Sequence, residues 1–183
     1  CPQRALRDSF HTSLQPSLAM NLQRFLDAQD PVYEQALEEL KAGRKQSHWI
    51  WFVFPQHRGL GCSPKAHFYG IECLDEARAY QKHPVLGRRL HECTTAVLRH
   101  TQQSASQILG VPDDLKFFSC MTLFSEAAPQ ELVFRLALQA FFNGSKDPET
   151  LRLCGLTTRR PGTERISGAP QQSLSASVLW PMR

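Results

Sequence analysis

Residues 45–70 hold the densest group of side chains that could bind a ligand or catalyse a reaction. The stretch contains two tryptophans, three phenylalanines and three histidines. Large aromatic rings beside a few convergent polar groups are typical of ligand pockets. No known reaction follows from these residue types, so whether the protein is an enzyme stays open. The candidate binding residues in this stretch are His48, Trp49, Trp51, Gln56, Arg58, Lys65 and Tyr69.

A second candidate group lies on a predicted helix in the second half of the chain. Lys116, Ser119 and Thr122 are three residues apart, so they share one face of an otherwise apolar helix. In one interpretation the two hydroxyls bond back to the preceding helical turn. In the other, this polar face meets His48 and Gln56 across a cleft, where Lys116 supplies positive charge for a phosphate or carboxylate.

A structural interpretation competes with the ligand pocket. Residues 49–54 form an unbroken apolar run, and aromatic side chains of this size dominate protein cores. His48 and Gln56 flank this run, where burial would require hydrogen-bond partners. Each is therefore either a satisfied structural residue or part of a site. The glycines at 59 and 61 precede Ser63 at a predicted helix start, where an anion could bind backbone amides, although such loops are common.

A nucleophile could be composed from Ser119 or Cys120 with His48, but no nucleophile-elbow sequence surrounds either residue. Asp113 and Asp114 begin a predicted helix, where carboxylates stabilise the positive end of the dipole. We expect capping from this acidic pair rather than general-base chemistry.

A metal site would need the ligand-type residues between positions 57 and 73. Structural zinc sites usually include a tight pair such as C-x-x-C, whereas four or five residues separate each candidate here from the next. The sequence therefore predicts no metal, and it implies no cofactor. The candidates are His57, Cys62, His67 and Cys73.

The elements that must position these side chains are helices. Several capping residues are followed by proline, then by apolar residues at a spacing near 3.6, then by glycine, as in residues 63–70 and 147–155. No alternating pattern or hairpin turn is present. Residues 49–54 have strand-like composition, but with no partner strand a short buried helix is favoured. We predict an all-α fold of about seven to nine helices, several of them short.

The length and composition of the chain fit one globular domain. The chain has 183 residues, of which 42% are hydrophobic, and no apolar run approaches the length of a membrane span. The six cysteines are scattered, which favours a reducing, cytoplasmic location. Cys93 and Cys120 fall in helical patterns, where free cysteine acts as a small buried hydrophobe.

The net charge of +4 lies in the two ends of the chain. Residues 1–20 carry a net charge of +1 and residues 156–183 carry +3, so residues 21–155 are neutral overall. A neutral helical region argues against a nucleic-acid-binding surface. The end segments lack periodicity, and we expect residues 1–20 to be a disordered extension, residues 21–155 the helical domain and residues 156–183 a disordered basic tail.

Several motifs of residues 21–155 resemble an uncharacterised family, domain of unknown function 1810. They include G-R-K-Q-S-H-W-I-W-F-V-F-P-Q at 43–56, G-L-G-C-S-P at 59–64, H-P-V-L-G-R-R-L at 83–90, and D-D-L-K with M-T-L-F within 113–124. The resemblance implies a compact all-α fold and no established activity. Some members carry the label calpastatin, which does not transfer, because such an inhibitor is expected to be a disordered repeat protein.

The leading functional hypothesis is a soluble helical domain with a pocket for a small anionic or nucleotide-like metabolite, acting as a binding protein or a hydrolytic enzyme. The alternative is a protein–protein interaction module in which the aromatic motif is purely structural. We expect no membrane partner and no nucleic acid. The oligomeric state and the identity of the ligand do not follow from the sequence.

Overall fold

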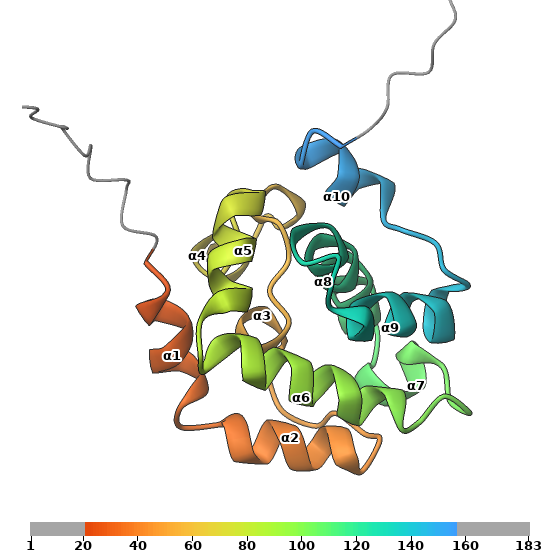
Figure 1. Ribbon diagram of the computed structural model, residues 1–183. Coiled ribbons are helices and arrows are strands. Elements are labelled where there is room, and N and C mark those ends of the chain that lie inside the picture. The colour runs from red at the N-terminus through yellow and green to blue at the C-terminus, as the bar shows by residue number, and fades with distance from the viewer. Residues whose placement is uncertain (1–20, 157–183) are drawn as a thin grey trace, which may run out of the picture.

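Helix α8 (Asp113–Ala127) runs through the centre of the fold and is covered on almost every side (Figure 1). The structure, a computed structural model, describes residues 21–156. The helices that pack against α8 are α3 (Ile50–Val53), α5 (Leu74–Lys82), α7 (Ala105–Leu109), α9 (Leu132–Phe142) and α10 (Pro148–Leu153). The remaining helices are α1 (Gln23–Gln29), α2 (Tyr33–Lys41), α4 (Pro64–Phe68), α6 (Leu86–Leu98) and the 3-10 helix η1 (Arg58–Leu60).

The predicted all-α class and single compact domain are confirmed. Residues 21–156 contain ten α-helices and no strand, although His57 and Ile71 form one isolated parallel bridge. The number of helices exceeds the predicted seven to nine.

The sequence of α8 explains its central position. Every residue from 119 to 125 is buried, because apolar side chains occur on all faces of the helix. A helix that is apolar all round is expected in a protein interior. Its three buried hydroxyl groups therefore need partners inside the protein.

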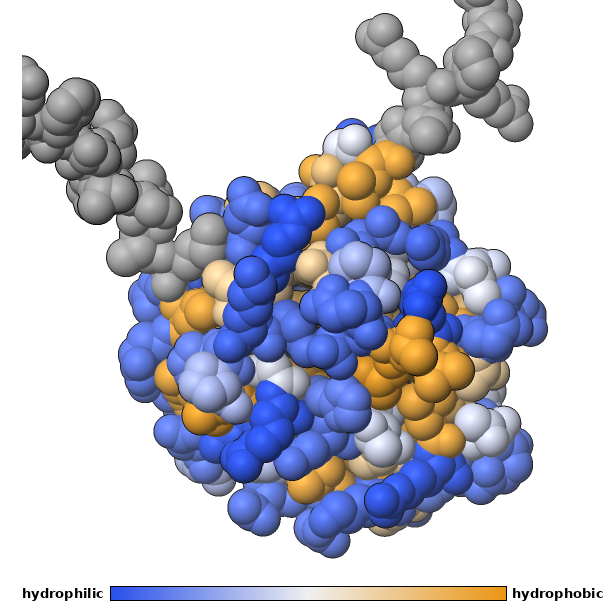
Figure 2. Space-filling model, viewed as in Figure 1, coloured by the Kyte–Doolittle hydropathy of each residue, from blue (hydrophilic) through white to orange (hydrophobic). Residues whose placement is uncertain are grey.

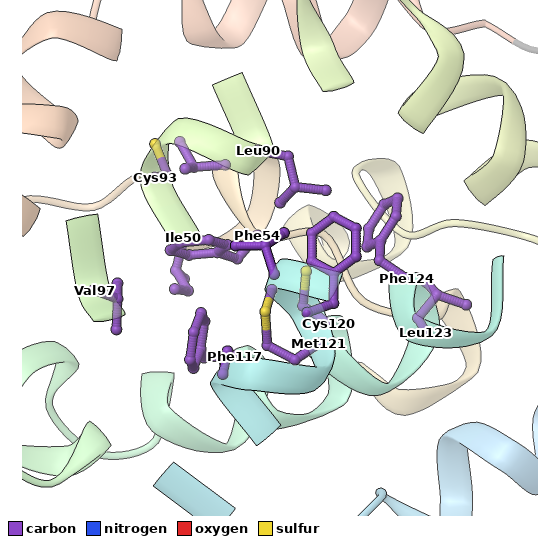
Figure 3. Close-up of a cluster of buried hydrophobic side chains, with 14 of the residues drawn as sticks. Ile50, Phe54, Leu90, Cys93, Val97, Phe117, Cys120, Met121, Leu123 and Phe124 are labelled. Carbon is purple, nitrogen blue, oxygen red and sulfur yellow. The ribbon is translucent and has the colours of Figure 1, made fainter. Parts of the chain in front are cut away.

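Aromatic rings from several helices form the core around α8. The ring centroids of Phe54 and Phe117 lie 4.9 Å apart, edge to face, and those of Tyr80 and Phe124 lie 5.4 Å apart. Figure 3 shows Phe54, Phe117 and Phe124 in one cluster, to which α6 contributes Leu90. These geometries are favourable for aromatic pairs and add to the burial of apolar area.

Two cysteines belong to this core, as predicted. Cys93 and Cys120 are both fully buried, and Figure 3 shows them among the apolar side chains. Burial raises the pKa of the Cys93 thiol to about 12 and that of Cys120 well above its ordinary value. Both thiols are therefore protonated at neutral pH and act as small hydrophobes.

Residues 49–54 form the predicted short helix. Helix α3 covers residues 50–53, and the backbone amide of Phe54 donates to the carbonyl of Ile50. The chain then turns at Pro55 and runs beside Ile71, whose amide donates to Gln56 and whose carbonyl accepts from Arg58. Helix formation satisfies backbone groups that a lone strand would leave unpaired.

A buried carboxylate organises the loop that leads into α3. Glu39 of α2 accepts hydrogen bonds from the backbone amides of Gln46 and Ser47, from the Ser47 hydroxyl and from the indole of Trp49. Burial alone would raise the pKa of Glu39, but these bonds outweigh it and lower the pKa to about 2. One side chain thus supplies the acceptors for two backbone amides of this loop, whereas the amides of Arg44 and Lys45 bond to the backbone carbonyls of Glu39 and Ile108.

Helix α10 is joined to α8 through its N-terminal cap. Asp147 accepts hydrogen bonds from the amides of Glu149 and Thr150, and its Oδ2 also accepts from the hydroxyls of Ser119 and Thr150 at 2.8 and 2.5 Å. The backbone amide of Asp147 donates to Thr122 Oγ1. The cap therefore bonds to two of the three buried hydroxyls of α8 as well as to the first turn of α10.

Among residues 21–156, no helix is both long and apolar enough to cross a membrane. The predicted extension at residues 1–20 and almost all of the predicted basic tail lie outside the described residues.

We predict that Glu39 makes stability depend on pH in acid. Its pKa is lower in the folded chain than its ordinary value of 4.5, so its contribution is complete above pH 4.5 and is lost as the pH falls toward 2. The wild type should lose up to about 3 kcal/mol of its free energy of unfolding in acid through Glu39, and Glu39→Gln should not show this loss. Urea unfolding between pH 6 and pH 2.5 measures the pH dependence of stability, with Glu38→Gln, an exposed neighbour, as control. Parallel stability curves for wild type and Glu39→Gln would contradict the assignment.

We also predict that Asp147→Ala destabilises the protein by about 2 kcal/mol, because it removes a helix cap and leaves buried hydroxyls without an acceptor. Urea unfolding measures the loss, and hydrogen exchange should show the amides of α10 opening first. Glu149→Ala, an exposed carboxylate in the same turn, is the matched control and should have a much smaller effect. Equal effects of the two substitutions would mean that Asp147 acts only as a surface charge.

Candidate functional site

A pocket of about 560 Å³ lies where α3, the loop before α4, and the first half of α8 meet. This volume is in the range of small-molecule sites. The walls combine apolar side chains with a lysine, an amide, two hydroxyls, a thiol and a carboxylate. The lining residues are Trp51, Gln56, Leu60, Gly61, Cys62, Ser63, Ala66, Pro112, Leu115, Lys116, Phe118, Ser119 and Asp147.

Trp51 is the aromatic wall of the pocket. Its side chain is half-buried, and two ammonium groups lie over its ring: Lys116 Nζ at 4.7 Å and Lys65 Nζ at 5.2 Å from the ring centroid. Each distance is within the range of a cation–π interaction. The pocket thus has an apolar surface with two positive charges beside it, one from α4 and one from α8.

Lys116 also shares a counterion with a second lysine. Asp113, one turn before it on α8, lies 2.6 Å from Lys116 Nζ through Oδ1 and 2.7 Å from Lys45 Nζ through Oδ2. Burial alone would raise the pKa of Asp113, but the hydrogen bonds from Lys116 and Lys45 outweigh it and lower the pKa. Asp113 is therefore ionised at neutral pH, and the three groups together carry one net positive charge.

Gln56 contributes an amide to the pocket. Its backbone carbonyl accepts from Ile71, whereas its half-buried side chain makes no hydrogen bond within residues 21–156. The wall beside it requires Gly61, since a Cβ atom there would lie 2.2 Å from the Cβ of Ala66. The glycine lets the loop approach α4 closely, and the Gln56 amide is left able to bond to a ligand.

The far wall of the pocket contains Ser119 and Asp147. The Ser119 hydroxyl donates to Asp147, while Thr122 behind it bonds back to the carbonyl of Phe118 at 2.9 Å. The two hydroxyls of the predicted polar face therefore behave differently. The carboxylate of Asp147 accepts four hydrogen bonds from two hydroxyls and two backbone amides, and no cation pairs with it among the described residues.

The structure brings together four of the ten sequence-predicted binding residues in this pocket: Trp51, Gln56, Lys116 and Ser119. Lys65 is exposed and reaches the ring of Trp51 from α4.

The other five predicted residues lie elsewhere. His48 is exposed, and Trp49 is buried with its indole bonded to Glu39. Arg58 pairs with Glu72, Thr122 is fully buried, and Tyr69 packs its ring against Phe25, Phe52 and Phe68.

The nucleophile and metal alternatives find no geometric support in the described residues. His48 does not line the pocket, Ser119 donates to a carboxylate, and Cys120 is sealed in the core. His57 is buried, its Nδ1 accepts from the amide of Gly59, and burial lowers its pKa. Residues 21–156 contain no group of three or more His, Cys, Asp or Glu side chains placed to hold a metal ion.

The pocket residues that sequence reasoning missed include Asp147, Leu115 and Phe118. Asp147 carried a signal, because an Asp-Pro pair marks a helix start and the buried hydroxyls of α8 require acceptors. Nothing in the sequence could show that one carboxylate both caps α10 and accepts the hydrogen bond from Ser119. Leu115 is exposed and Phe118 is half-buried, and neither has a distinguishing pattern.

Comparison with known proteins agrees with the helical fold. None of the curated proteins matches the chain. A solved structure, the conserved hypothetical protein Rv1873 from Mycobacterium tuberculosis at 1.38 Å, is 50% identical and superposes with a TM-score of 0.74. The match covers 75% of this chain and 99% of that one. A family model described as "Protein of unknown function (DUF1810)" matches residues 19–154, and the chain therefore belongs to this family.

Proposed function

We propose that the pocket at Trp51 binds a small anionic metabolite with a planar ring, such as a nucleotide. One observation carries the proposal: two segments some sixty residues apart place Trp51, Gln56 and Lys116 in the same pocket. An indole face suits a planar ring, an amide suits its polar edge, and an ammonium suits a phosphate or carboxylate. The combination suits a ligand that has all three features.

The charges around the pocket favour an anion. Lys116 and Lys65 both lie beside the Trp51 ring, and Lys45 offsets the charge of Asp113. Asp147 opposes an anion, but its carboxylate already accepts hydrogen bonds from Ser119 and from α10. A binding role is favoured over hydrolysis, because no histidine lines the described pocket and the carboxylate beside Ser119 is held as the cap of α10.

A protein-interaction role is the second candidate. Leu132 and Leu136 of α9 are 57% and 55% exposed and lie one helical turn apart. Figure 2 shows apolar surface at the position that α9 occupies in Figure 1. Two leucines cover much less than the roughly 800 Å² that each partner usually buries in a stable interface. The pocket is therefore the stronger of the two candidates.

The proposal predicts that AMP or ADP stabilises the protein in thermal unfolding and binds in calorimetry. Adenosine, which lacks the charge, and pyrophosphate, which lacks the ring, should bind more weakly. Lys116→Met should weaken AMP or ADP binding roughly 10-fold or more through loss of a charge-assisted hydrogen bond. Trp51→Leu should weaken it by a similar factor through loss of the ring contact.

Lys82→Met is the matched control for these variants, because Lys82 is an exposed lysine outside the pocket lining. It should leave nucleotide affinity unchanged. The proposal is wrong if neither AMP nor ADP binds, or if both pocket variants bind them as tightly as the wild type does.

A further inference from the structure

Behind the pocket, the carboxylate of Asp113 forms ion pairs with two lysines whose surroundings differ. Asp113 bonds to Lys116 through one oxygen and to Lys45 through the other. The side chains of Lys45, Asp113 and Lys116 are 7%, 15% and 21% exposed, respectively. Lys116 lines the pocket, whereas Asp113 and Lys45 do not.

Lys45 is held in place from several directions. Its backbone amide donates to the carbonyl of Ile108 at 2.7 Å, and the two residues that follow it are bonded to Glu39. Its ammonium group also lies 5.2 Å from the ring centroid of Trp49 in the core. Lys45 therefore lies beside Asp113 with little exposure to solvent and does not line the pocket.

Lys116 is held less firmly. It is the most exposed of the three groups, and its ammonium lies over Trp51 at the pocket wall. Its contact with Asp113 spans three residues on one helix, so a change of side-chain rotamer is enough to break it. An anion beside Trp51 would compete with Asp113 for this lysine.

Breaking an ordinary buried ion pair is costly, because it leaves one charge without a partner. Here Asp113 would keep Lys45 at 2.7 Å after Lys116 had turned away. We infer that Asp113 is an exchangeable counterion: Lys116 leaves it for the anionic group of the ligand, while Lys45 stays and keeps the carboxylate neutralised. This inference rests on the proposed function, and it makes Lys45 and Asp113 positioning residues of the site.

The inference predicts opposite effects for two substitutions in the same ion pair. Lys45→Met should weaken AMP binding about 10-fold, because Asp113 then depends on Lys116 alone. Asp113→Asn should strengthen AMP binding severalfold, because Lys116 is released. The double variant should bind like Asp113→Asn. If both single variants weaken binding and the double variant does not recover it, the pair is merely structural and the inference is wrong.

A measurement without ligand tests the same point. The carboxyl carbon of Asp113 can be titrated by NMR in the full chain carrying Lys116→Met. If Lys45 alone neutralises Asp113, its pKa should stay below the ordinary value of 3.8, whereas Lys45→Met should raise it further than Lys116→Met does. A pKa above 3.8 in Lys116→Met would overturn the inference.

The two experiments separate the two proposals. If wild-type protein binds no nucleotide, the proposed function fails, and the titration decides the role of Lys45 by itself. If wild type binds AMP but Lys45→Met and Asp113→Asn change affinity in the same direction, the proposed function stands and the exchangeable counterion does not.

Discussion

The carboxylate of Glu39 is the interaction on which the architecture of the site depends. Residues 44–49 belong to no helix, so their backbone amides need acceptors from elsewhere. Glu39 supplies them for Gln46 and Ser47 and also binds the indole of Trp49, which lies directly before α3. Trp51 follows two residues later and lines the pocket, whereas Trp49 is buried. The segment that this buried charge holds thus lies between Lys45, whose amide bonds to Ile108, and Trp51.

Helix α8 joins the interior to the site. Its apolar faces pack against α5 and α9, whereas Lys116 and Ser119 line the pocket and Ser119 also bonds to the cap of α10. A helix that fills the core cannot shift without disturbing the packing on every side, because protein interiors are close-packed. Lys116 and Ser119 therefore project from a rigid element, which suits a pocket that is formed before its ligand arrives.

Much of the fold follows from local sequence. The capping residues and prolines marked the starts of α4 and α10, and the lack of a partner strand correctly favoured a helix at residues 49–54. Side-chain placement was harder to foresee. His48 and Gln56 flank the same apolar run, yet His48 is exposed and Gln56 lines the pocket. Loop geometry set by Glu39 and Ile71, both distant in sequence, decides between them. Likewise, spacing placed Thr122 beside Ser119 on one face, but only packing shows that Thr122 is sealed.

The two lysines at Trp51 have a consequence for how an anion would approach the pocket. Their ammonium groups lie 4.7 and 5.2 Å from the same ring centroid. One group belongs to α4 and the other to α8, so positive charge reaches this wall from two separate elements. Charges of one sign at a concave surface raise the local concentration of ions of the opposite sign. The charge pattern therefore gathers anions near this wall before any of them is bound, and added salt weakens the effect.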